Sequence, residues 1–207
     1  RRASDGVFVV LHDKTLDRTT EASGPAAQRT SRELASLRLR DGEGGEDAAS
    51  TEEHLPLLSE LLQAARGRVL INVDTKFPSD LPEVARAVLE KDLGETVLVK
   101  CEIAGGPADL PGDHPAFGPL PFMPVVKSEP GRFAADLRAL APLAPFMVES
   151  QPASFEDLAN GMEVAREMGT RIWLNTLDCS HMAGFSDTAA LADKEAVWGR
   201  LLDLGVT

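Results

Sequence analysis

The sequence predicts an α/β fold, a (β/α)8 TIM-type barrel, with about six of the eight strand-helix units of such a barrel present in its 207 residues. Short runs rich in Val, Ile, Leu and Phe recur along the chain, and their apolarity is continuous, as in strands of a parallel sheet that is covered on both faces. Helical segments lie between most of these runs. Each run also ends in a polar or ionisable residue, as expected where barrel strands converge on one mouth.

Each apolar run is predicted to form one strand, and all six strands are expected to be parallel. The predicted strands cover residues 7–12, 69–74, 96–101, 121–126, 145–149 and 171–176. The whole chain, residues 1–207, is interpreted as a single domain, because chains of this length usually build one core. No G-x-G-x-x-G motif follows the first run, which argues against an open dinucleotide-binding sheet.

Helix ends are indicated by capping residues. Thr30 and Glu33 have the spacing of a capping box, and Ser79 is predicted to cap the helix that follows it. Gly94 and Gly169 occupy positions typical of a glycine that ends a helix.

Both ends of the chain lie close to predicted strands. The sequence opens on RRASDG, next to the first run, and stops at LLDLGVT, where a glycine after a helix usually precedes another strand. Because six units are seen where a barrel has eight, we expect a chain truncated at both ends from a barrel of roughly 250 residues.

Composition and charge limit the class of protein. The formal charge of −12 argues against nucleic acid as the main partner, since phosphate backbones are bound by clustered Lys and Arg. No apolar run approaches the roughly 20 residues that a membrane-spanning helix needs. The composition is that of a soluble globular protein and is compatible with a cytoplasmic, a secreted or a periplasmic location. Cys101 and Cys179 lie far apart beside apolar runs and are expected to be buried thiols.

Polar side chains at the strand ends are the candidate functional residues. They are His12, Asp13, Asp74, Lys76, Lys100, Lys127, Glu149 and Asn175. Within INVDTK, residues Asn72, Asp74 and Lys76 alternate and therefore share one strand face.

The stretch DGVFVVLHDKTLDRTT resembles the signature of the glycerophosphodiester phosphodiesterase family, in which a strand that ends in His-Asp is followed by Leu-x-Arg-Thr-Thr. The stretch HLPLLSELLQAARGRVLINVDTK is similar to the next block of that family, and RIWLNTL is similar to a late strand that carries Trp and Asn. The three stretches span nearly the whole chain in the family's order.

The resemblance implies a strand-helix barrel that hydrolyses glycerophosphodiesters to glycerol phosphate and an alcohol with a divalent cation, calcium or magnesium. It implies that His12 is a catalytic histidine, that Asp74 is a metal ligand and that Lys76 is the lysine that follows this ligand. Asp74 stands where many members have Glu. The family's second histidine, in a His-Arg motif, and its Glu-x-Asp metal pair would precede Arg1, so we expect the 207 residues alone to be inactive.

The chemistry of phosphodiester hydrolysis suggests further roles. His12 suits proton transfer near neutral pH, and carboxylate oxygen such as that of Asp74 suits calcium or magnesium. Lys76 and Lys100 are expected to contact phosphate oxygens, although Lys100 could instead extend into solvent from a strand end.

The remaining candidates would shape the substrate pocket. Glu149 is expected to support the metal or bind glycerol hydroxyls, and Trp173 with Asn175 to line the wall, with Trp173 as core packing the alternative. Arg18, with Thr19 and Thr20, is expected to hold the loop after His12. Among the other histidines, namely His54, His114 and His181, we rank His181 first as a site residue.

Two other functions fit the same residues. One is a non-catalytic barrel that binds phosphoesters or a partner through the same mouth. The other is a related phosphodiesterase of the lysophospholipase D type, which shares the metal and histidine chemistry.

Overall fold

The computed structural model describes residues 1–104, 106–111, 118, 120–178 and 185–207. Within it the chain forms two compact units. The first unit contains Arg1–Ile71 and Arg86–Thr96, and the second contains Asn72–Ala85 and Val97–Thr207. The interpretation of residues 1–207 as a single domain stays a prediction.

The first unit has a small core beneath short elements. These are the 3-10 turn η1 (Ala26–Gln28), α1 (Ser31–Ala35), β1 (Arg38–Arg40), β2 (Ser50–His54) and α2 (Leu58–Ala65). β1 and β2 pair antiparallel, with Arg38 opposite His54 and Arg40 opposite Ser50. The buried core residues are Ala3, Val9, Leu11, Leu16, Ala26, Leu34 and Leu55. Because β1 and β2 are polar, their hydrophobic pattern gave no strand signal.

The predicted strand at residues 7–12 is wrong. This segment makes isolated antiparallel bridges, Phe8 with Arg2 and Val9 with Leu57, and it lies in no strand of the described sheets. Its apolar residues do not form one buried run, because Val7 and Val10 are exposed whereas Val9 is buried. The segment therefore packs as an extended chain with one face on the core.

The second unit is built around the other predicted strands. They are β3 (Ile71–Thr75), β4 (Val97–Glu102), β5 (Phe122–Lys127), β6 (Met147–Gln151) and β7 (Arg171–Leu174). They form a sheet in the order β3-β4-β5-β6-β7, and the pairs β4-β5, β5-β6 and β6-β7 are parallel. Five of the six predicted strands are thus present, with ends displaced by one or two residues.

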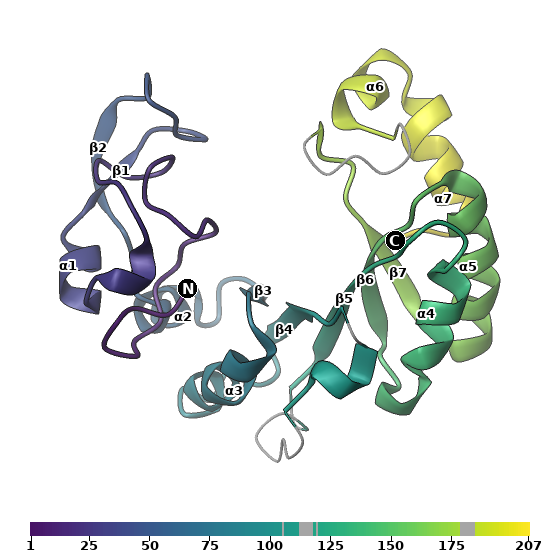
Figure 1. The fold of residues 1–207 in the computed structure, drawn as a ribbon, viewed down its shortest axis with the longest axis horizontal. Helices are drawn as coiled ribbons and strands as arrows, with labels where there is room; N and C mark the ends of the chain where they lie inside the picture. Colours follow the sequence, from purple (N-terminus) through teal and green to yellow (C-terminus); the bar gives the residue numbers. More distant parts are fainter. Residues whose placement is uncertain (105, 112–117, 119, 179–184) are drawn as a thin grey trace. The chain divides into compact units, whose positions relative to one another are not determined.

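Helices alternate with these strands, as in the wall of a (β/α) barrel. They are α3 (Leu81–Leu89), α4 (Phe133–Ala139), α5 (Phe155–Met168), α6 (Asp187–Ala192) and α7 (Arg200–Leu204). Short 3-10 turns are η2 (Pro78–Asp80), η3 (Gly106–Asp109) and η4 (Ala141–Leu143), and η6 (Glu195–Gly199) is a π-helical segment that leads into α7. Figure 1 shows α4, α5 and α7 on the same side of β5, β6 and β7.

The two faces of this sheet differ in chemistry. On the face that packs against α4 and α5, Val126, Val148 and Ile172 belong to one buried core with Phe133 and Leu158. The strand register places the alternate residues on the other face, which carries the buried apolar side chains of Met123, Val125 and Met147 together with charged ones. We call this second face the polar face, and it carries Asp74, Lys100, Glu102, Lys127, Glu149 and Trp173.

Half of the predicted helix caps are confirmed. The Thr30 side chain accepts a hydrogen bond from the Glu33 backbone and the Glu33 side chain accepts one in return, and Gly169 ends α5 with φ +66°. The predictions for Ser79 and Gly94 are wrong. Ser79 lies inside η2, and α3 ends at Leu89, ahead of a residue with positive φ that is Asp92 and not Gly94.

Candidate functional site

The first part of the candidate site lies at the end of β3. Alternation along the strand puts Asp74 and Lys76 on the same face. Lys76 Nζ donates to Asp74 Oδ2 at 2.6 Å, and the two side chains are partly exposed, 21% for Lys76 and 36% for Asp74. The lysine and the carboxylate predicted from the sequence therefore form an ion pair at the edge of the polar face.

A second ion pair lies deeper on this face. Lys100 Nζ, on β4, is 2.5 Å from Glu149 Oε2 on β6 and 3.9 Å from Asp74 Oδ2. The Lys100 side chain is 14% exposed and that of Glu149 is 6% exposed. Lys100 therefore connects the two carboxylates across the sheet and does not extend into solvent.

Trp173 on β7 and Asn175, just after the end of that strand, continue this network. The side-chain amide of Asn175 donates to Glu149 Oε1 at 2.9 Å, and the indole of Trp173 donates to Asn175 Oδ1 at 3.0 Å. Trp173 is 38% exposed, so it is not a core residue. All six residues predicted for the metal and the substrate, namely Asp74, Lys76, Lys100, Glu149, Trp173 and Asn175, are thus joined by successive polar contacts.

The network limits what each group can do. Both carboxylate oxygens of Glu149 accept from protein donors, one from Lys100 and one from Asn175. Glu149 is buried, and a buried carboxylate needs such partners to remain charged. Its clearest role is to hold Lys100 and Asn175 in place, and Lys76 is the more exposed of the two predicted phosphate-binding lysines.

The sequence reasoning missed a further pair on the polar face. Lys127 Nζ is 2.7 Å from Glu102 Oε2, and the two side chains are 53% and 44% exposed. The pattern of strand ends indicates Lys127 as a candidate residue but does not indicate Glu102. The alternation in VLVKCE, which puts Glu102 on the same face as Lys100, is the signal that identifies it.

Cys101 confirms the expectation of a buried thiol. Its side chain is completely buried, and its Sγ lies 3.5 Å from the backbone oxygen of Glu102. Burial, followed by the negative charges of Asp74 and Glu102, raises the pKa of this thiol to about 12. Cys179, His114 and His181 lie outside the described residues.

The predicted catalytic residue, His12, belongs to the first unit. Its side chain is 73% exposed, and its Nδ1 lies 2.9 Å from Asp13 Oδ1. The guanidinium of Arg1 donates to the backbone oxygen of His12 at 3.0 Å and to that of Asp13 at 3.0 Å. The backbone of the pair is therefore tied to the start of the chain, while the ring faces solvent.

The guanidinium of Arg18 forms an ion pair with the Asp13 carboxylate. This contact confirms the prediction that Arg18 holds the loop after His12. Its Nε donates to Asp13 Oδ2 at 2.7 Å, its Nη2 to Asp13 Oδ1 at 3.1 Å, and its Nη1 to the backbone oxygen of Glu43 at 2.6 Å. The hydrogen bonds from Arg18 and then from His12 lower the pKa of Asp13 from 3.8 to about 2. The hydroxyl of Thr20 donates to the backbone oxygen of Leu16 at 2.9 Å and stabilises the same loop.

The described residues fit a divalent metal only in part. Asp74 offers a partly exposed carboxylate, and hard oxygen ligands of this kind suit calcium and magnesium. In the part of the chain that the structure describes, no group of three or more His, Cys, Asp or Glu side chains could hold a metal ion. Asp74 can therefore supply one ligand among the six or more that these ions take.

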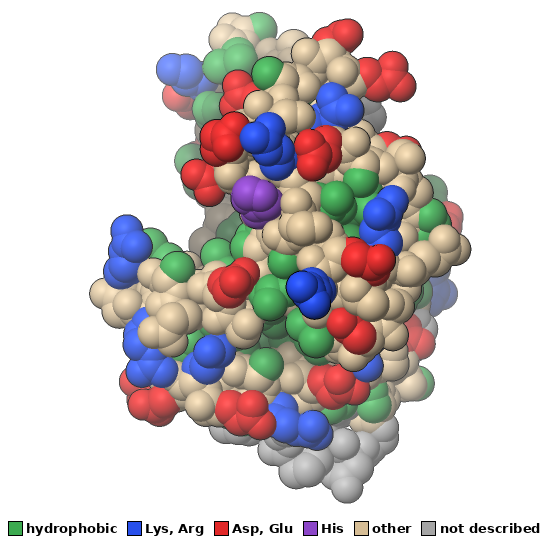
Figure 2. All heavy atoms as spheres, turned by 90° about the vertical axis from the view of Figure 1, so that its left-hand side faces the viewer, with side chains coloured by type: hydrophobic (Ala, Val, Ile, Leu, Met, Phe, Trp, Pro, Cys, Tyr) green, Lys and Arg blue, Asp and Glu red, His purple; other side chains and the backbone are tan. Residues whose placement is uncertain are grey.

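Two surface properties bear on partners. Figure 2 shows acidic and basic side chains interspersed over the face it presents, without a gathering of Lys and Arg. Among the described helices, none has the length and apolarity to cross a membrane.

Comparison with known proteins gives two family matches. Residues 1–100 match the glycerophosphoryl diester phosphodiesterase family, and residues 122–207 match a domain of unknown function. The first match contains His12, Asp74 and Lys76, and it confirms the resemblance found in the sequence. No curated protein matched the chain.

Solved structures share the fold. A glycerophosphoryl diester phosphodiesterase from Parabacteroides distasonis is 21% identical with a TM-score of 0.73, over 100% of this chain and 67% of that one. A glycerophosphodiester phosphodiesterase from Agrobacterium tumefaciens is 22% identical with a TM-score of 0.63, over 95% of this chain and 77% of that one. These similarities confirm the prediction of a partial (β/α) barrel.

Proposed function

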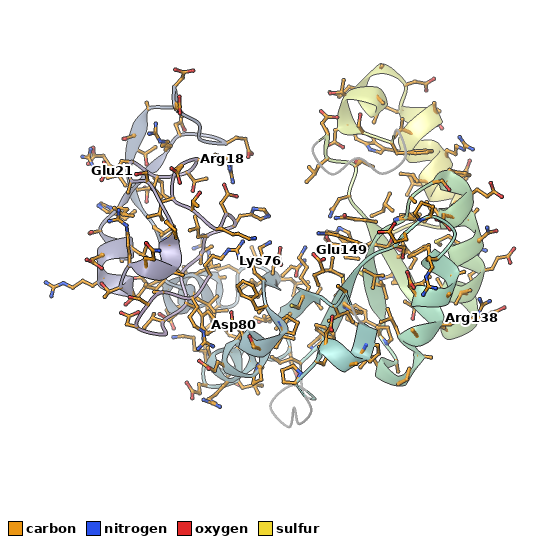
Figure 3. All side chains as sticks on the ribbon, in the orientation of Figure 1. Arg18, Glu21, Lys76, Asp80, Arg138 and Glu149 are labelled. Atoms are coloured by element: carbon orange, nitrogen blue, oxygen red, sulfur yellow. The ribbon has the colours of Figure 1, made fainter. Side chains whose placement is uncertain are left out.

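We propose that this relative of the glycerophosphoryl diester phosphodiesterases takes part in the hydrolysis of glycerophosphodiesters to glycerol phosphate and an alcohol, with calcium or magnesium as cofactor. The observation that carries the proposal is the match of residues 1–100 to the family, a segment that includes His12, Asp74 and Lys76. The polar network of the second unit, part of which can be followed at Lys76 and Glu149 in Figure 3, supports it.

His12 would serve as general acid or base. A phosphodiester has a poor alkoxide leaving group, so hydrolysis needs a group that moves a proton at the oxygen atoms involved. Imidazole is suited to this near neutral pH. The ring of His12 is largely exposed, so it is open to a substrate, and its backbone is held by Arg1.

Asp74 and Lys76 would act on the anionic phosphate. Asp74 would hold the cation with carboxylate oxygen, and a bound divalent cation supplies neutralisation of phosphate charge. Lys76 would add a positive charge next to it, since its Nζ already lies 2.6 Å from the Asp74 carboxylate.

The rest of the polar face would bind the substrate. Lys100 would add positive charge from a position held by Glu149, and Asn175 would offer polar contacts beside the partly exposed ring of Trp173. In this assignment Glu149 acts through its two partners and not through a direct contact with the phosphate.

Substitution of His12 and Asp74 tests the proposal. In the natural full-length protein, His12→Ala should lower turnover of glycerophosphocholine by about 10²–10⁴-fold, the range for a lost general acid or base. Added metal should not restore it. Asp74→Ala should instead raise the calcium or magnesium concentration needed for activity, because one oxygen ligand is lost.

The matched control is His54→Ala, which removes an exposed histidine at the end of β2. This variant should keep normal activity. Near-normal activity of His12→Ala would reject the catalytic assignment, and unchanged metal dependence in Asp74→Ala would remove Asp74 from the metal site.

A binding role without catalysis is the second candidate. It is favoured by the finding that the described residues contain no cluster of three metal-ligating side chains. Binding of glycerophosphocholine by calorimetry without release of glycerol phosphate, in the complete protein, would favour this candidate, and preference for a lysolipid would favour the lysophospholipase D type.

A further inference from the structure

The contacts of Asp13 point to a function beyond loop structure. The side chain of His12 is 73% exposed, yet one of its ring nitrogens is engaged in a polar contact. Asp13 Oδ1 lies 2.9 Å from Nδ1, and the same carboxylate receives two hydrogen bonds from Arg18. The polar contact with Asp13 is therefore the device that orients this ring.

The charge state of Asp13 determines which nitrogen carries the proton. Hydrogen bonds from Arg18 and His12 lower the pKa of this carboxyl to about 2, so near neutral pH it is ionised and can only accept hydrogen bonds. The neutral imidazole must then place its proton on Nδ1 to complete the contact. This leaves Nε2 as the basic nitrogen of the ring.

We propose that Asp13 is a positioning residue that holds His12 in the Nδ1-protonated form and presents Nε2 to the substrate, and that Arg18 holds Asp13 for this purpose. The inference rests on the proposed function for the role of His12. In the proton-transfer step Nε2 accepts a proton and the ring becomes an imidazolium, or the imidazolium returns that proton. The Nδ1 proton and the charge of Asp13 stay unchanged, as in other sites where a carboxylate orients a histidine.

Arg18 is itself held from the far side. Its Nη1 donates to the backbone oxygen of Glu43, and its own backbone oxygen accepts from the Gly45 amide at 2.7 Å. A Cβ atom at Gly44, whose φ is +76°, would lie 2.1 Å from that backbone oxygen of Arg18. The loop 41–47 therefore approaches Arg18 so closely that only glycine fits at position 44. This contact helps to hold the guanidinium that donates to Asp13.

The ring tautomer can be measured without substrate or metal. Long-range proton-nitrogen NMR of the histidine rings, with the pH above the imidazole titration, distinguishes a protonated Nδ1 from a protonated Nε2. The chain has four histidines, so His12 can be assigned by comparison with His12→Ala. We expect protonated Nδ1 in the native protein and a shift toward protonated Nε2 in Asp13→Asn, whose amide no longer requires a donor.

Arg18→Lys keeps the positive charge but loses the pair of hydrogen bonds to the Asp13 carboxylate. Its spectrum should therefore lie between those of the native protein and of Asp13→Asn. The matched control is Asp17→Asn, the same change at a carboxylate that accepts from the Gly24 amide, and it should leave the His12 signals unchanged. A native spectrum with protonated Nε2, or an unchanged tautomer in Asp13→Asn, would overturn the inference.

Kinetics connect the tautomer to function. In the complete protein, Asp13→Asn should lower kcat by about 10–100-fold, the scale seen when an orienting partner is lost, with little change in KM. A shifted tautomer with unchanged kcat would overturn the positioning role. Full activity of His12→Ala would instead reject the proposed function, even if NMR showed the Nδ1-protonated ring of His12. Failure of the positioning role and failure of the proposed function are therefore distinguishable.

Discussion

The ion pair of Asp13 should be visible in the pH dependence of stability. Arg18 and then His12 lower the pKa of Asp13 from 3.8 to about 2 in the folded chain. At 1.36 kcal/mol for each unit, this corresponds to about 2 kcal/mol of folding free energy at neutral pH, an upper value because Arg18 is partly exposed. The side chain of Asp13 is 26% exposed, so most of this contribution should survive screening by solvent.

The sign follows from the folded pKa being lower than the unfolded one. The contribution is fully present above about pH 5 and is lost as the pH falls through the folded pKa near 2, with about half remaining at pH 3. Asp13→Asn removes the charge, so its free energy of unfolding should be about 2 kcal/mol lower at pH 7 and only about 1 kcal/mol lower at pH 3.

Urea unfolding of the native chain and Asp13→Asn at both pH values measures these differences. The control is Asp47→Asn, the same charge change in the exposed loop 41–47, which should alter stability by less than about 0.5 kcal/mol. A difference for Asp13→Asn that is equal at pH 7 and pH 3 would refute the reasoning, because linkage requires it to shrink with the charge.

Three further outcomes are expected. Gly161→Ala should destabilise the chain by about 1–3 kcal/mol in urea unfolding, because its Cβ would lie 2.1 Å from the fully buried ring of Phe133; a neutral effect would contradict this packing. Glu149→Leu should lower the free energy of unfolding by about 3–5 kcal/mol, because it leaves the charge of Lys100 buried without its partner. The second substitution Lys100→Met should restore much of this stability, and equal stability of the single and double variants would contradict a stabilising role of the pair. Cys101 should resist alkylation at pH 8 until the chain is unfolded, in a variant that lacks the other cysteine, because its pKa of about 12 and complete burial keep it as a thiol; rapid labelling of the folded chain would contradict both.

The sequence predicted the second unit better than the first. Parallel strands that are covered by helices need long apolar runs, and such runs are visible in VLINV and FMPVV without knowledge of their partners. Asp74, Lys100 and Glu149 could be predicted as neighbours because parallel strands bring their ends to one edge. Their pairing could not be predicted, since it depends on the lengths of side chains across strands that are far apart in the sequence.

The first unit contains less periodic information. The run VFVVL predicts a buried strand, and this prediction is wrong because continuous apolarity does not reveal that Val7 and Val10 are exposed. The role of Asp13 was missed for a related reason. Its two hydrogen bonds from Arg18 arise from a turn that brings residues five apart together, and no regular repeat in the sequence marks such a contact.

The division of the sheet into two faces has a consequence for how this protein can change in evolution. Along each strand, neighbouring residues alternate between the helix-covered core and the polar face, so a substitution at Lys100 leaves the packing of Val99 and Cys101 in place. Mutations that alter the chemistry of the polar face can therefore accumulate at little cost to the helix-facing core, apart from those that break the buried pair with Glu149. A descendant could acquire a new specificity by changing Glu102 and Lys127, which are exposed and bonded mainly to each other, while inheriting the same scaffold.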